Sequence, residues 1–316
     1  MTRRAAKSWA YEHLLIGNLE RMARSLRHAP QLRPERHGVQ ITRNRRYGPL
    51  PEQRLDIYQL PDRARPSPVV IYIHGGGFRF FDKDTHWAIA ARFAREGYLV
   101  FNVDYRVGPT HRYPAPVQDV GLAMQWVVRH APAMGGDVNR LVLAGESAGA
   151  NLATGLAISC SWRRSELWAQ TVWELNVQPK VLAPACGYLQ VSEPGRHAET
   201  KQIPSWMAAR IHAVSDGYLP AHTPAQPAHD YANPLALLET LGAPQRRFPA
   251  TFAICGGDDP VRGDTERLGC ALERLRVPHQ VEVYDGGGHT FHALMFTPLA
   301  RRAWTDKLTF VARNLR

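Results

Sequence analysis

The stretch Leu141-Val142-Leu143-Ala144-Gly145-Glu146-Ser147-Ala148-Gly149 decides how this 316-residue chain is interpreted. Its first four apolar residues are typical of a buried strand, and the run after it favours a helix. A serine between two glycines at such a strand-to-helix turn has the G-x-S-x-G form, which lifts the hydroxyl above the sheet. Side chains at the glycine positions would crowd so tight a turn. The stretch therefore predicts that Ser147 is a nucleophile, with the N–H groups of the following helix aimed at the same point.

The segments around this turn alternate between apolar strands and amphipathic helices. Strands are predicted at 69–73, 99–103, 141–144, 180–183, 251–254 and 280–284. Helices are predicted at 85–96, 115–130, 148–160, about 263–276 and 298–313. Short alternating runs at 39–41 and 55–58 are typical of antiparallel strands. Near-continuously apolar strands separated by helices indicate an α/β fold, with a mostly parallel sheet covered on both faces.

Two segments stand outside this alternation. Residues 1–35 are expected to be mostly helical and amphipathic. Residues 188–248 are rich in proline and histidine and show a helical period only near 204–216. A long insertion between core strands is usually functional, so it is predicted to form a lid between core parts 51–187 and 249–316.

Composition and charge exclude several other classes of protein. The formal net charge is +11, but the arginines are scattered in pairs, which favours a solvated basic surface over a nucleic-acid partner. Four separated cysteines offer no zinc-type spacing, and Cys186 and Cys255 are expected to be buried free thiols. No stretch has the length of a membrane span or the pattern of a signal peptide, and no Walker A or G-x-G-x-x-G element occurs. We expect a cytoplasmic protein with no cofactor and no metal.

A serine nucleophile requires hydrogen-bond donors for the oxyanion that develops during attack. His74-Gly75-Gly76-Gly77-Phe78 follows the predicted strand 69–73, at the edge where parallel sheets bind ligands. A glycine run there leaves backbone N–H groups free to point into the crevice. We expect Gly75 and Gly76, with the N–H of Ala148, to form the oxyanion hole.

The serine also requires a base and an acid, in the chain order Ser…Asp/Glu…His. His289 follows the last strand on the glycine-rich loop Asp285-Gly286-Gly287-Gly288, which favours it over His292 as the base. Asp258 and Asp259 both follow the strand at 251–254, and Asp264 is better placed to open the next helix. Pro260 holds Asp259 in an extended conformation, which favours Asp259 as the triad acid. Asp258 remains the alternative. Glu146 is interpreted as an anchor for neighbouring loops.

The chain resembles the hormone-sensitive-lipase-like branch of the α/β hydrolases, in particular its bacterial carboxylesterases. The matching motifs occur in the family's order across about residues 54–292: His74-Gly75-Gly76-Gly77, Asp104-Tyr105-Arg106, the stretch from Tyr113 to Asp119, Gly145-Glu146-Ser147-Ala148-Gly149, Asn233-Pro234-Leu235, Asp259-Pro260-Val261 and His289. The resemblance implies an α/β-hydrolase fold with a helical cap. Residues 1–50, which also hold the first strand, and the insertion 188–248 would form this cap. It also implies a triad of Ser147, His289 and Asp259, and oxyanion donors Gly75, Gly76 and Ala148. Glu146 departs from the family, which usually carries Asp there.

The leading hypothesis is therefore a serine carboxylesterase that acts on short-chain acyl esters through an acyl-enzyme. Bulky groups are expected to line its compact pocket: Phe78, Trp87, Trp206 and Tyr218. One alternative is an amidase of the arylformamidase type, which Gly77 disfavours because such enzymes often carry a bulky residue there. Another is a non-catalytic small-ligand-binding relative, which the presence of Ser147 and His289 disfavours. A homodimer paired through the strand at 280–284 is a further suggestion of the resemblance.

Overall fold

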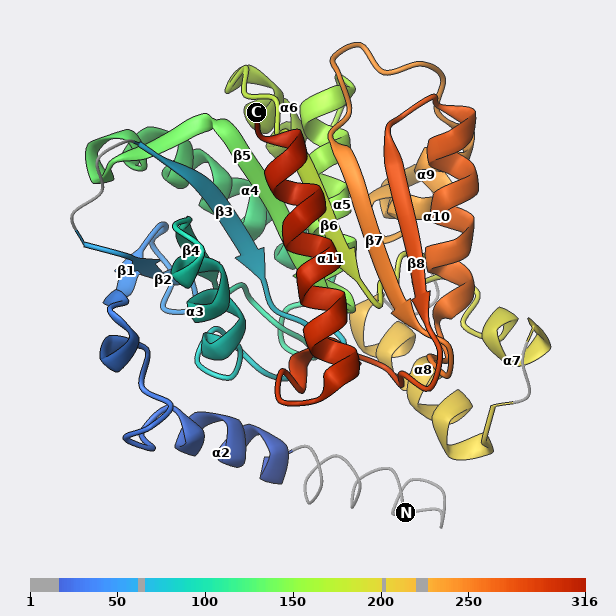
Figure 1. Ribbon diagram of the computed structural model, residues 1–316. Coiled ribbons are helices and arrows are strands. Elements are labelled where there is room, and N and C mark those ends of the chain that lie inside the picture. Colours follow the sequence, from blue (N-terminus) through green and yellow to red (C-terminus); the bar gives the residue numbers. More distant parts are fainter. Residues whose placement is uncertain (1–16, 62–65, 201–202, 220–226) are drawn as a thin grey trace.

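An eight-stranded sheet forms the centre of the computed structural model, which describes residues 17–61, 66–200, 203–219 and 227–316 (Figure 1). Within these residues the strand order is β1-β2-β4-β3-β5-β6-β7-β8. The strands are β1 (Gln40–Arg46), β2 (Arg54–Gln59), β3 (Ser67–Ile73), β4 (Leu99–Val103), β5 (Gly136–Glu146), β6 (Val181–Ala185), β7 (Ala250–Gly256) and β8 (His279–Tyr284). Neighbours from β4 to β8 run parallel, whereas β2 is antiparallel to both β1 and β4. The predicted α/β fold and mostly parallel sheet are confirmed.

Helices cover both faces of this sheet. Two pack on one face: α3 (Trp87–Arg95) and α11 (Pro298–Asn314). Five pack on the other: α4 (Ala115–His130), α5 (Ala148–Ser161), α6 (Leu167–Glu174), α9 (Pro234–Thr240) and α10 (Arg262–Arg274). The strands β3, β4, β6 and β7 are buried almost throughout, because each must fill a core on both sides.

The segment 188–248 contains more helix than its sequence predicts. Besides α8 (Ser205–Tyr218), which was expected near 204–216, it forms α7 (Arg196–Thr200), η4 (Pro227–Ala232) and α9. Leu235 and Leu238 of α9 are fully buried in the core that also holds α5 and α10. The later part of the segment therefore belongs to the layer that covers the sheet, while α8 lies beyond the carboxyl ends of the strands (Figure 1). The helix α9 has 7 residues, too few to show a helical period in the sequence.

The helix α2 (Gly17–Leu26) lies beside the loop that connects β3 to α3. The backbone N–H of Phe81 donates a hydrogen bond to Glu20, and the indole of Trp87 donates one to the carbonyl of Ala23. An ion pair of 2.7 Å joins Arg24 to Asp82. These contacts fix the helix through its side chains and carbonyls. The rest of the helix predicted over residues 1–35 falls partly on residues 1–16, outside the described part of the chain.

Three short 3₁₀ turns complete the described elements: η2 (Pro34–His37), η3 (Pro132–Met134) and η5 (Phe291–Ala293). No described helix has the length and apolar character needed to cross a bilayer. Cys160, Cys186 and Cys255 are buried free thiols, as predicted for the last two, and Cys270 is an exposed one. The strand β8 forms one edge of the sheet, so the pairing of two copies through 280–284 stays a prediction.

Candidate active site

Ser147 lies on the turn between β5 and α5, in a backbone conformation that serine rarely adopts. Its φ is 51° and its ψ is −116°, so the residue is strained. A Cβ on Gly145 would overlap the carbonyl of Gly149, and a Cβ on Gly149 would overlap the carbonyl of Ile73. Both glycines are thus required by close backbone approach. The turn has the shape that the G-x-S-x-G pattern predicts.

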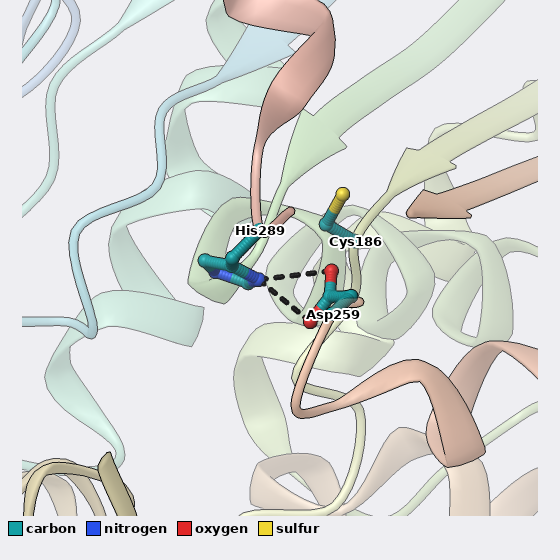
Figure 2. A group of neighbouring side chains, drawn as sticks. All are labelled: Cys186, Asp259 and His289. Carbon is teal, nitrogen blue, oxygen red and sulfur yellow. Dashed lines mark hydrogen bonds and ion pairs between the residues drawn. The ribbon is translucent and has the colours of Figure 1, made fainter. Parts of the chain in front are cut away.

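A chain of short contacts leads from this serine to a buried carboxylate. The Nε2 atom of His289 lies 3.0 Å from Oγ of Ser147, and its Nδ1 lies 3.0 Å from each carboxylate oxygen of Asp259. Figure 2 shows the imidazole facing both oxygens. The backbone N–H of Val261 also donates to Asp259. The structure therefore brings together the three residues that the sequence predicts as nucleophile, base and acid.

The three candidate aspartates occupy different environments. Asp259 is fully buried beside His289, whereas Asp258 is exposed. Asp264 lies in the first turn of α10, as expected, and its carboxylate accepts hydrogen bonds from the backbone of Leu189 and Gln190. The geometry thus selects Asp259 as the partner of the imidazole.

Electrostatics polarise this pair in opposite directions. Burial opposes the charge on His289, but the Asp259 carboxylate outweighs it and raises the pKa of the imidazole above its ordinary value of 6.5. Burial of Asp259 likewise opposes its charge, yet His289 and the hydrogen bonds it receives lower the pKa of the carboxyl. The pair therefore favours an ionised carboxylate facing a basic imidazole.

The glycine loop after β3 reaches the same place. Gly76 and Gly77 have φ values of 113° and 61°, and both line the cavity above Ser147. Gly75 differs, because a Cβ there would lie 2.9 Å from the carbonyl oxygen of Glu146. Ala148 is the buried first residue of α5. Gly76 and Gly77 thus line the cavity, whereas Gly75 packs on the elbow.

A cavity of about 350 Å³ opens over the serine. Ser147, His289 and the two glycines form its floor, and one face of α8 forms a wall. That face consists of residues at helical spacing: Trp206, Met207, Arg210, Ile211 and Val214. The remaining lining comes from Leu19, Phe81, Glu146, Tyr188, Pro260, Val261 and Thr290. The spacing on α8 was visible in the sequence, but nothing there indicated which face meets the serine.

Of the four aromatic residues predicted for the pocket, Trp206 lines this cavity. Phe78 and Tyr218 are stacked on each other with ring centroids 3.7 Å apart, buried outside the described lining. Trp87 packs in the core of the opposite face of the sheet and holds α2 through its indole. Trp87 is absent from the described lining, so a role for it in the pocket stays a prediction.

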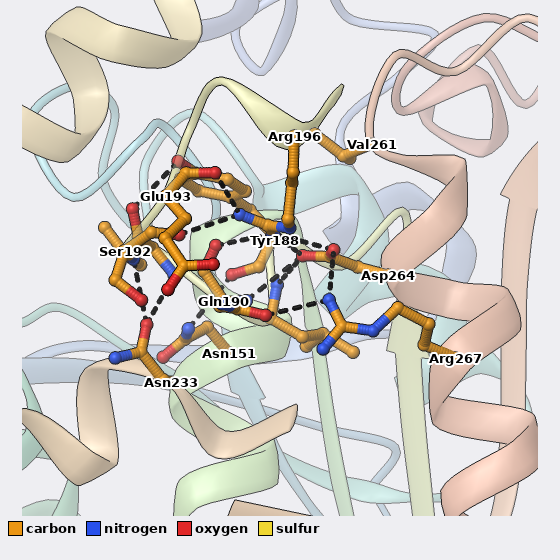
Figure 3. A network of polar contacts seen from close by, with 12 residues as sticks. Asn151, Tyr188, Gln190, Ser192, Glu193, Arg196, Asn233, Val261, Asp264 and Arg267 are labelled. Carbon is orange, nitrogen blue, oxygen red and sulfur yellow. Dashed lines mark hydrogen bonds and ion pairs between the residues drawn. The ribbon is translucent and has the colours of Figure 1, made fainter. Parts of the chain in front are cut away.

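A polar network anchors the loop that carries Tyr188. Arg196 donates to Asp264 and to the carbonyl of Gln190, and Asn233 accepts from the backbone of Val191 and Ser192 (Figure 3). The network ties the chain after β6 to the start of α10, directly beyond the Asp259 loop. It therefore fixes two walls of the cavity relative to each other.

Among the described residues, Cys186, Asp259 and His289 are the group whose potential metal-ligand atoms all lie within 4.8 Å of one another (Figure 2). Two of the three are already joined to each other by hydrogen bonds. Burial raises the pKa of the Cys186 thiol well above its ordinary value, which opposes the thiolate that a metal would require. The arrangement fits proton transfer better than metal binding.

Comparison with known proteins points to one family. Residues 70–293 match the family model described as alpha/beta hydrolase fold. Esterase LipI of Mycobacterium tuberculosis is 30% identical over 286 residues, which cover 84% of this chain and 78% of that protein. Carboxylesterase NlhH of the same species is 37% identical over 242 residues, which cover 76% of this chain and 71% of that protein.

Solved structures share the fold. A bacterial heroin esterase superposes with a TM-score of 0.78 at 23% identity, covering 95% of this chain and 92% of that one. Esterase LipW from Mycobacterium marinum superposes with a TM-score of 0.75 at 23% identity, covering 98% and 90%.

Proposed function

This chain belongs to the hormone-sensitive-lipase-like family of α/β hydrolases, and we propose that it is a serine carboxylesterase acting on short-chain acyl esters. The matched relatives bear the names of an esterase and a carboxylesterase. One observation carries the proposal: the hydrogen-bonded series Ser147–His289–Asp259, with each step at 3.0 Å, ends in the floor of a cavity. Such a series activates a serine hydroxyl, which by itself is a weak nucleophile at neutral pH.

In the proposed reaction, Oγ of Ser147 attacks the ester carbonyl while Nε2 of His289 takes its proton. The alcohol leaves with that proton, and the acyl group stays on the serine. Water then attacks the acyl-enzyme, again giving its proton to His289, and the acid is released as Ser147 regains its hydrogen. Asp259 stays ionised and stabilises the imidazolium that forms at each attack.

The oxyanion formed at each attack requires donors that are already in place. We assign this role to the N–H groups of Gly76, Gly77 and Ala148, which replaces Gly75 of the original expectation by Gly77. The lining of the cavity supports the change, because Gly76 and Gly77 reach it and Gly75 is packed on Glu146. Removal of one such donor costs on the order of 10²–10³ in rate in related chemistry.

The shape of the cavity supports a short acyl chain. Its volume is about 350 Å³, and α8 closes it with Met207, Ile211 and Val214. A Cβ on Gly77 would lie 2.8 Å from a methyl group of Val214, so α8 packs directly on the glycine loop. This contact leaves little length for an acyl chain above the serine.

The proposal is tested by covalent labelling and turnover together. A fluorophosphonate probe is expected to label the parent chain and leave Ser147→Ala unlabelled. The parent is expected to hydrolyse p-nitrophenyl acetate and butyrate faster than the decanoate, and Ser147→Ala to lose on the order of 10⁴-fold or more of this activity. Circular dichroism of Ser147→Ala checks that the fold is kept. Retained turnover in the folded variant would remove Ser147 from the mechanism.

The same assay separates esters from amides. N-formylkynurenine offers the formamide bond of the arylformamidase alternative. An esterase is expected to leave it intact while it cleaves the butyrate ester. Faster cleavage of the formamide would reassign the substrate and keep the catalytic machinery.

A further inference from the structure

Glu146 lies next to the proposed nucleophile and contributes to the lining of the cavity, and its carboxylate pairs with two imidazoles. It is 5% exposed. Its Oε1 accepts a 2.7 Å hydrogen bond from Nε2 of His86, the residue that precedes α3. Its Oε2 lies 3.0 Å from Nε2 of His292, three residues beyond His289. One carboxylate therefore joins two segments that are far apart in the sequence.

The same residue supports the glycine loop. A Cβ on Gly75 would lie 2.9 Å from the carbonyl oxygen of Glu146 and 3.2 Å from its Cγ. Glu146 is part of the elbow, and it contacts both the loop that follows β3 and the loop that carries His289. These are the three places from which the proposed oxyanion donors, base and nucleophile come.

Further contacts make the His292 side of this arrangement rigid. The indole of Trp304 on α11 donates a 3.0 Å hydrogen bond to the carbonyl of His292. Phe291 is buried against Tyr284, with ring centroids 5.3 Å apart. On the other side, Nδ1 of His86 lies 2.8 Å from Oγ1 of Thr85. Glu146 is thus held between two fixed imidazoles.

The carboxylate is ionised in this setting. Burial opposes its charge, but His86 and His292 outweigh burial and hold the pKa of Glu146 well below its usual range. Burial also opposes protonation of His86, yet Glu146 raises the pKa of that imidazole. Burial lowers the pKa of His292 below its ordinary value, although Glu146 acts in the opposite direction.

The other titratable groups facing Glu146 come from β3, the glycine loop, the segments that follow β4 and β6, and α11. Burial raises the pKa values of Tyr72, Tyr105 and Cys186, so these three groups are neutral. Burial lowers the pKa of His74 to about 3, so it is neutral as well. Burial lowers the pKa of Lys307 on α11 to about 8, although Glu146 acts in the opposite direction.

We propose that Glu146 is a positioning residue for the proposed esterase reaction, one that locks the His289 loop to the nucleophile elbow and places a second negative charge behind the imidazole. The inference rests on the proposed function, since it assigns Glu146 a part in the same proton transfer. A base displaced by about 1 Å costs up to 10²-fold in rate, so a tie this close to both reacting groups acts on kcat. Because both carboxylate oxygens are already engaged by His86 and His292, no direct contact with the substrate is assigned to Glu146, and KM is expected to stay within a factor of about two.

The decisive variant is Glu146→Gln, which keeps the shape and removes the charge. Its kcat for p-nitrophenyl butyrate is expected to fall at least about ten-fold. The loss of a nearby anion disfavours the imidazolium, so the acid limb of kcat/KM is expected to move to lower pH by roughly half a unit or more. Glu146→Asp keeps the charge and is expected to keep the acid limb at its parent position. A folded Glu146→Gln with parent kcat and an unmoved acid limb overturns the proposal.

A second variant covers the case in which Glu146→Gln does not fold. His292→Gln leaves the charge of Glu146 and alters the tie to the His289 loop, so kcat is expected to fall while the acid limb stays in place. Parent kcat in this variant overturns the positioning role. Asp119→Asn is the matched control. Asp119 is a buried residue of α4 that pairs with Arg106 and is absent from the lining of the cavity. Its replacement is expected to lower stability without moving the acid limb.

Failure of this inference and failure of the proposed function give different results. If the parent chain neither binds the fluorophosphonate probe nor hydrolyses the esters, the proposed function fails and the inference fails with it. If the parent is active and labelled but Glu146→Gln and His292→Gln match it in kcat and acid limb, the inference alone is wrong.

Discussion

The elbow around Ser147 and the helix α8 face each other across one cavity, and they are built on different principles. At the elbow, backbone contacts leave no room for a Cβ on Gly145 or Gly149. On α8, the helix backbone would accept many side chains, and Trp206 is half exposed. Chemistry is thus proposed to reside in a part of the molecule that tolerates no change, and substrate choice in a part that does.

The largest effect expected in the rigid region, after loss of the serine itself, comes from Asp259→Asn. The amide cannot hold the imidazole in the same tautomer or stabilise its charge, so kcat is expected to fall by about 10³–10⁴-fold. The neighbouring Asp258→Asn alters an exposed side chain and is expected to keep parent kcat. Steady-state kinetics on p-nitrophenyl butyrate compare the two. Equal losses in both variants would contradict the assignment of the acid.

Gly149→Ala tests whether backbone contact fixes the elbow. The new methyl group would overlap the carbonyl of Ile73, so the free energy of unfolding is expected to fall by roughly 3 kcal/mol or more. Gly263→Ala is the matched control, because that helical position of α10 has open space around it. It is expected to gain up to about 1 kcal/mol. Urea unfolding measures both, and a Gly149→Ala variant of parent stability would show that the elbow tolerates change.

The pH profile of the reaction depends on charges that act on His289 from both sides of the cavity. Asp259 raises the pKa of the imidazole above 6.5 and Arg210 on α8 acts in the opposite direction. The base must be neutral to accept a proton, so kcat/KM is expected to fall as the pH drops through this raised pKa. Removal of the α8 charge in Arg210→Gln is expected to move the acid limb to still higher pH. A shift to lower pH would contradict the sign of this coupling.

The smallest effects are expected from α8. Met207→Ala lengthens the cavity, so the rate on p-nitrophenyl octanoate relative to acetate is expected to rise several-fold, since each buried methylene contributes about 0.8 kcal/mol. Total activity on acetate is expected to change little. His212→Ala, on the exposed face of the same helix, serves as the control. An unchanged chain-length profile in Met207→Ala would place substrate choice elsewhere.

The sequence predicted those features that backbone geometry imposes. The glycines around Ser147, the glycine loop after β3 and the chain order of Asp259 and His289 each leave a local pattern. The apolar strands likewise reveal the parallel sheet, because residues buried on both faces cannot alternate with polar ones. The roles proposed for the triad remain predictions, now with distances attached.

The sequence did not reveal features that depend on contacts between distant segments. Nothing in the pattern of α8 indicates that Met207 and Ile211 meet the serine, since the period of a helix marks a face and not its partner. Gly75 and Gly77 look alike in sequence, and they are separated by the approach of Glu146 to Gly75 and of Val214 to Gly77. Trp87 likewise has a distant partner: its indole donates to the carbonyl of Ala23 on α2, 64 residues earlier in the chain, and nothing in the sequence around Trp87 indicates this contact.

The contacts that hold α2 are separate from those that hold the reacting groups. Leu19 contributes to the wall, yet α2 is held by Glu20, Ala23 and Arg24 to the segment after the glycine loop. No described contact in that set involves Ser147, Asp259 or His289. A change of sequence in α2 is therefore expected to reshape the wall of the cavity while the hydrogen bonds among Ser147, His289 and Asp259 stay as they are.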